Sequence, residues 1–92
     1  MKRIFKYKLE MVLFQTVEMP QGAEILCIQM QNESPCIWAL VEPNATVTER
    51  TFQMVGTGQD IGDYGERKYL GTIQLNVYVF HCFELVEQYY KS

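Results

Sequence analysis

An alternation of apolar and polar side chains with a period of two runs through most of the chain, and it constrains the fold more than any other feature. Successive side chains of a β-strand point to opposite faces, so this period predicts strands that bury one face. Many of the alternating residues are β-branched or aromatic, which favours strands further. We therefore expect strands joined by short turns, at residues 3–9, 14–19, 23–31, 36–41, 47–55, 68–75 and 77–86.

Two neighbouring segments are expected to form the centre of the fold. Residues 23–31 are apolar on both faces, which is typical of a strand in the middle of a sheet. Residues 36–41 form the most hydrophobic run and are expected to pair antiparallel with them across the turn at 32–35. The last two segments are either separate strands or one strand bent at Asn76. Only residues 84–91 suit a helical turn or two, or a frayed end.

Six or seven short strands in 92 residues predict one all-β domain, built as a small antiparallel β-sandwich or as a partly open barrel. Either architecture leaves strand edges that need to be covered or paired. Pairing with a second subunit is one solution, and it also adds stability to a domain of this size. We therefore expect a homo-oligomer.

The balance of charge excludes one large class of partners. The chain has 8 lysines and arginines against 11 aspartates and glutamates, a net charge of −3 and a pI of about 5.0. Because DNA and RNA backbones are bound by basic faces, polymeric nucleic acid is not an expected partner. No segment has the run of about 18 apolar residues that a membrane helix needs, so no membrane association is expected either.

Cysteine usage and the first residues indicate a cytosolic protein. Cys27, Cys36 and Cys82 are odd in number and have no short paired spacing, so they are predicted to be reduced and mostly buried thiols. Residues 1–6 become charged again before a signal-peptide core forms. One histidine and three scattered cysteines do not match the ligand spacing of a zinc site, so neither a metal nor another cofactor is expected.

His81 is the only histidine, which makes it the first candidate for acid–base catalysis. A catalytic histidine needs an orienting carboxylate and a nucleophile, and the sequence supplies no recognisable pair of these. We expect His81 to be a packed or hydrogen-bonded structural residue. The chain is accordingly not expected to be an enzyme.

Residues 56–67 are the only long irregular segment, and they hold four of the six glycines. Loops of this length are uncommon in small domains, and those that occur usually have a function. At its start, Gly56, Thr57 and Gly58 either present converging backbone N–H groups to an anion or form an ordinary glycine-rich turn. They do not form a Walker motif, which needs a lysine and a following helix.

Cations and aromatic residues flank this loop in the sequence. Arg50 precedes it, Arg67 is its last residue and Lys68 follows, so these cations either converge on a phosphate or carboxylate or are solvated strand charges. Tyrosines near the loop are expected to contact a ligand, whereas the single tryptophan either stacks on a base or packs in the core. The predicted ligand-binding residues are Arg50, Gly56, Thr57, Gly58, Tyr64, Arg67, Tyr69 and Trp38.

Six short motifs follow one another in a fixed order over nearly the whole chain. They lie at residues 19–23 (Met-Pro-Gln-Gly-Ala), 38–41 (Trp-Ala-Leu-Val), 50–52 (Arg-Thr-Phe), 56–58 (Gly-Thr-Gly), 69–72 (Tyr-Leu-Gly-Thr) and 79–84 (Val-Phe-His-Cys-Phe-Glu). With this set of motifs, the chain resembles a family of small uncharacterised proteins carried by tailed bacteriophages and prophages. The resemblance implies a phage accessory protein expressed in the bacterial cytoplasm, and it brings no established catalytic residues.

Small phage proteins without enzymatic motifs commonly act by occupying a molecule of the host. Our leading hypothesis is an immune-evasion protein that sequesters a small anionic ligand without turnover, similar in behaviour to viral proteins that sequester cyclic nucleotide immune signals. A nucleotide is then the ligand expected at the loop. The alternative is a protein–protein inhibitor of a host protein, or a virion-associated interaction module, that uses an exposed β edge or an acidic face.

Overall fold

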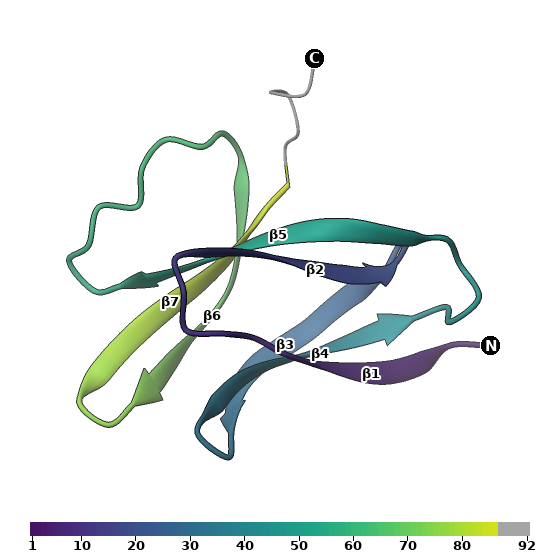
Figure 1. The fold of residues 1–92 in the computed structure, drawn as a ribbon, viewed down its shortest axis with the longest axis horizontal. Coiled ribbons are helices and arrows are strands. Elements are labelled where there is room, and N and C mark those ends of the chain that lie inside the picture. Colours follow the sequence, from purple (N-terminus) through teal and green to yellow (C-terminus); the bar gives the residue numbers. More distant parts are fainter. Residues whose placement is uncertain (87–92) are drawn as a thin grey trace.

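The computed structural model describes residues 1–86, and within them the chain forms seven strands and no helix (Figure 1). The all-β prediction is confirmed, and each predicted segment agrees with an observed strand to within two residues at either end. The strands are β1 (Arg3–Lys8), β2 (Phe14–Pro20), β3 (Glu24–Gln31), β4 (Ser34–Val41), β5 (Val47–Gly56), β6 (Arg67–Leu75) and β7 (Tyr78–Leu85).

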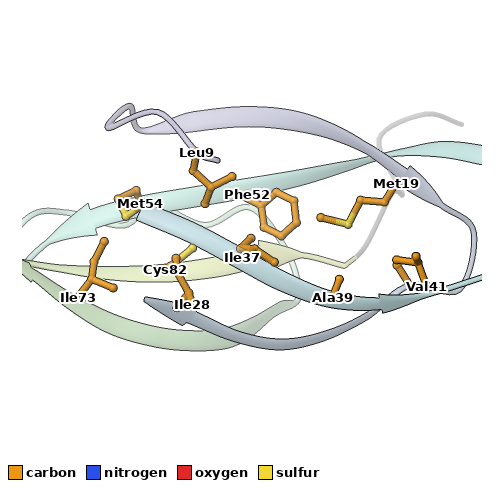
Figure 2. Packing of buried hydrophobic residues seen from close by; sticks show 11 residues of the cluster. Leu9, Met19, Ile28, Ile37, Ala39, Val41, Phe52, Met54, Ile73 and Cys82 are labelled. Carbon is orange, nitrogen blue, oxygen red and sulfur yellow. The ribbon is translucent and has the colours of Figure 1, made fainter. Parts of the chain in front are cut away.

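The strands form two antiparallel sheets that stack as the layers of a β-sandwich. One sheet has three strands in the order β1-β4-β3, and the other has four in the order β2-β5-β7-β6. The sheets do not close into a barrel, so the sandwich is the correct one of the two expected architectures. Alternate side chains of both sheets meet in one core, as Figure 2 shows for Leu9, Met19, Ile28, Ile37, Ala39, Val41, Phe52, Met54, Ile73 and Cys82.

The prediction that residues 23–31 form a central strand is wrong. Strand β4 lies in the middle of its sheet, whereas β3 lies at the edge. The pairing of β3 with β4 shifts its register between Ile25 and Cys27, which is a β-bulge. Leu26, the residue at the shift, is 46% exposed. The apolar residues on both sides of β3 therefore reflect a bulged edge strand.

Two hairpin turns differ from what the sequence indicated. Asn32 and Glu33 both have positive φ, 51° and 65°, as a two-residue turn of type I′ requires. Pro35 consequently lies inside β4 and pairs with Met30. Strands β6 and β7 are separate, because Asn76 (φ 57°) begins a second two-residue turn. Of the tail at 84–91, Glu84 and Leu85 end β7, and residues 87–91 lie outside the described part of the chain.

Cys82 lies in the core with no exposed surface, and this burial predicts a stability that depends on pH. Burial, together with the smaller effect of the nearby Glu84 carboxylate, raises the pKa of the Cys82 thiol from 9.0 to about 12. The unfolded chain therefore releases this proton at a lower pH than the folded chain does. It follows that the free energy of unfolding falls as the pH rises from about 9 to about 12.

The Cys82→Ala variant should flatten this alkaline dependence, as urea denaturation at a series of pH values between about 8 and 11 would measure. Ile73→Val is a matched control, because it also shortens a core side chain and leaves the thiol in place. An alkaline slope that is equally steep in Cys82→Ala would assign the effect to another group.

Candidate functional site

Two buried or half-buried polar side chains anchor the loop at 57–66 to the four-stranded sheet. Gln53 points away from the core because it alternates with core residues of β5, and it is only 1% exposed. Its Nε2 donates a hydrogen bond to the Ile61 carbonyl oxygen over 2.8 Å. Arg67 donates to the Gly62 carbonyl oxygen at 3.0 Å and to Oε1 of Gln53 at 3.2 Å. The loop is thus held in place by its own sheet.

Arg67 was predicted to neutralise an anion. In the structure, however, its guanidinium group is hydrogen-bonded to other groups of the protein. Besides the bonds to Gln53 and Gly62, the group donates to the Ile61 carbonyl oxygen at 3.4 Å. It also lies 5.8 Å from the centre of the Phe83 ring, a cation–π distance. Its main contacts therefore orient the loop.

Gly56, Thr57 and Gly58 form a tight turn whose N–H groups are partly used internally. The N–H of Gly56 donates to Oε1 of Gln59 at 2.9 Å, and the N–H of Gln59 donates back to the Gly56 carbonyl oxygen at 3.0 Å. Thr57 donates its N–H to the Val79 carbonyl oxygen at 3.2 Å. Gly58 has φ 88°, which suits glycine. Two of the three N–H groups proposed to hold a phosphate thus already have acceptors.

A chain of hydroxyl groups runs through His81 on the outer face of the four-stranded sheet. Nε2 of His81 lies 2.7 Å from Oγ1 of Thr57, and Nδ1 lies 3.0 Å from Oγ1 of Thr72. The Thr72 hydroxyl is also hydrogen-bonded to the Tyr69 hydroxyl. Thr57 and Tyr69 are both predicted site residues. They are linked through His81 and Thr72, which were not among the predicted site residues. The register of β6, β7 and the turn produces this contact, and no local pattern indicates it.

Arg50 lies far from the glycine turn and is engaged in an ion pair. Along β5 it is six residues from Gly56, which corresponds to about 20 Å of extended strand. Its Nε and one terminal nitrogen bind the two carboxylate oxygens of Glu84, at 2.5 and 3.0 Å. The other terminal nitrogen donates to the Ala23 carbonyl oxygen at 2.7 Å. The expected convergence of Arg50 with Arg67 on one ligand is therefore not observed.

The two remaining predicted residues lie in different places. Trp38 belongs to β4 in the other sheet, where it is half-buried and alternates with the core residues Ile37 and Ala39. It therefore faces away from the core and does not join the loop. Tyr64 lies in the loop, is 51% exposed and packs edge-on against Phe14 of β2, with ring centres 4.9 Å apart.

A different surface emerges at the end of the sandwich where the glycine turn lies. We call it the loop end and define it by residues 10–14, 56–64 and 76–80, three connections that lie on the left in Figure 1. Eight of its large apolar side chains are between 36% and 83% exposed. They are Met11, Val12, Leu13, Phe14, Ile61, Tyr64, Val77 and Tyr78.

Three open hollows, of about 150, 160 and 340 Å³, are lined by six of these side chains, and the other two, Phe14 and Tyr64, pack against each other. Phe80 lines the hollow beside Val77 and the hollow beside Val12, and Thr57 lines the hollow beside Val77 and the one next to His81. The loop end is therefore one continuous surface. Its ionisable side chains other than tyrosine are Glu10, Asp60 and Asp63, and its three segments contain no lysine or arginine.

Two further properties concern the described part of the chain. Among residues 1–86, no three histidine, cysteine, aspartate or glutamate side chains lie close enough together to hold a metal ion. The same residues include no helix of the length and hydrophobicity that crossing a membrane requires.

The fold and this surface define a small β-sandwich domain with an exposed apolar end. The chain belongs to the family described as a domain of unknown function (DUF7352), whose model matches residues 1–91. No curated protein and no solved structure matches it.

Proposed function

We propose that this protein is a non-catalytic binding module that captures another protein through its loop end. The observation that carries the proposal is the gathering of eight exposed apolar side chains from three separate segments on one continuous surface. Contiguous apolar patches of this kind mark interaction sites on soluble domains. Exposed tyrosines such as Tyr64 and Tyr78 are also typical of interface centres.

The shape of the loop end supports a protein partner better than a small anion. Pockets for small molecules are mostly enclosed, whereas these hollows are open and shallow. The arginines expected to neutralise an anion are engaged with Glu84 and with loop carbonyl groups. The carboxylates of Glu10, Asp60 and Asp63 border the apolar side chains instead. We therefore expect the partner to present apolar side chains flanked by lysine or arginine.

The resemblance to phage proteins suggests where this module would act and on what kind of target. In the bacterial cytoplasm, a phage accessory protein of this type would act by occupying a host protein. The proposal is thus the inhibitor or interaction module that the sequence offered as an alternative, with the loop end as its contact surface.

The tagged protein should retain a stoichiometric partner from bacterial lysate, and the double variant Val12→Ser, Val77→Ser should lose it. Both side chains are exposed, at 46% and 83%, so their replacement should leave the fold stable. Val47→Ser is the matched control, because Val47 is 58% exposed in β5 at the opposite end of the sandwich. Equal retention by the double variant, or loss with the control, would contradict the proposal.

Sequestration of a nucleotide is the second candidate, supported by the hydroxyl and imidazole groups of Thr57, His81, Thr72 and Tyr69 on one exposed face. These groups can donate to and accept from a polar ligand, and Tyr69, at 57% exposure, can stack on a base. Native mass spectrometry of the same purified samples distinguishes the candidates. A retained nucleotide without a stoichiometric protein would favour sequestration.

A further inference from the structure

Three of the four edge strands carry features that prevent pairing with another chain. In β1, Arg3, Lys6 and Lys8 make half of the strand cationic. The register of β3 shifts between Ile25 and Cys27, and the register of β6 shifts at Gly71. Charged residues and bulges are the usual protections of exposed sheet edges. These edges are therefore poor templates for a further strand.

Strand β2 lacks these protections. It pairs with β5 in an unbroken register, and Glu18 is its only charged residue. Its proline, Pro20, stands at the very end of the strand, where it leaves the remaining N–H groups in place. Within residues 1–86, no strand pairs with its outer side. The edge of β2 is thus the one best suited to accept a strand.

The hydrogen bonds between β2 and β5 determine which backbone N–H and C=O groups of β2 point toward its open edge. The N–H of Met54 donates to the Leu13 carbonyl oxygen at 2.9 Å, so Leu13 and every second residue after it face β5. The backbone N–H and C=O groups of Phe14, Thr16 and Glu18 consequently point away from β5. They form a row that an antiparallel strand can pair with.

We propose that two copies of this chain associate through antiparallel pairing of their β2 strands, with Thr16 at the two-fold axis. This register places Thr16 opposite Thr16 and Phe14 opposite Glu18 of the second copy, so no like charges face each other. A symmetric pairing of β1 with the axis at Lys6 would instead place Lys6 opposite Lys6. The β2 pairing joins the two four-stranded sheets into one continuous sheet of eight strands, and it does not depend on what the loop end binds.

Sedimentation velocity over a range of concentrations should show a dimer that dissociates on dilution. The variants Thr16→Lys and Thr16→Glu should each weaken it about five-fold or more, because each places like charges opposite each other at the axis. Gln29→Lys is a control, since it adds the same charge at an exposed position of β3. An equimolar mixture of the two Thr16 variants should restore the dimer, because lysine then faces glutamate.

Restoration by mixing also separates an interface effect from a folding defect, since a misfolded variant would not be rescued by another. Two results would overturn the proposal. One is a parent protein that stays monomeric up to millimolar concentration. The other is a dimer whose dissociation constant is the same in the parent and in both Thr16 variants.

Discussion

Replacing Arg50 with leucine should lower the free energy of unfolding by about 3–5 kcal/mol, the range for removing one partner of a buried ion pair. The Glu84 side chain is only 7% exposed, and both of its carboxylate oxygens bind the Arg50 guanidinium. Without the guanidinium, this mostly buried carboxylate loses its ion-pair partner, and the Ala23 carbonyl oxygen loses its donor. Urea denaturation followed by the fluorescence of the single tryptophan would measure the loss.

The reciprocal variant provides the control for this interpretation. Glu84→Leu should cost less than Arg50→Leu, because the Arg50 side chain is 20% exposed and can turn its charge to water. The double variant should recover part of the loss, since it leaves no unpaired charge. If Arg50→Leu changed the free energy of unfolding by less than about 1 kcal/mol, the ion pair would contribute no more than an exposed one.

The positions of the strands could be predicted because they depend on local sequence. Side-chain alternation is a property of a few consecutive residues, and segments such as β2 and β5 were found to within one residue. The sheet position of β3 could not be found in this way. An edge strand with a bulge at Leu26 and a central strand both show apolar residues on two faces, and only the pairing distinguishes them.

The candidate site depends on contacts between distant segments, so the sequence indicated only part of it. Arg50 and Glu84 are 34 positions apart, and nothing near Arg50 in the chain identifies its partner. The sequence did find the loop and its glycines, because these are local features. The apolar residues of the loop end were missed because each of its three connections contributes only a few exposed side chains, and none is unusual by itself.

Gly71→Ala should destabilise the fold by about 2–4 kcal/mol through two separate effects, backbone strain and overpacking. Gly71 has φ 155°, a conformation that residues with a side chain rarely adopt. A Cβ there would also lie 2.8 Å from Cγ2 of Ile28, in the facing sheet. The bulge between Tyr69 and Gly71 thus brings the backbone of β6 close to β3. Thermal unfolding of the variant would measure the loss.

Two comparisons separate the strain from the steric contact. Gly22→Ala tests strain alone, because Gly22 has φ 83° and a Cβ there would meet no atom within 4 Å, so it should cost only about 1 kcal/mol. Ile28→Leu removes the Cγ2 atom while keeping the side-chain volume, so it should rescue part of the Gly71→Ala loss. Without such rescue, strain at Gly71 would account for the whole effect, and the approach of β6 to β3 would tolerate a side chain.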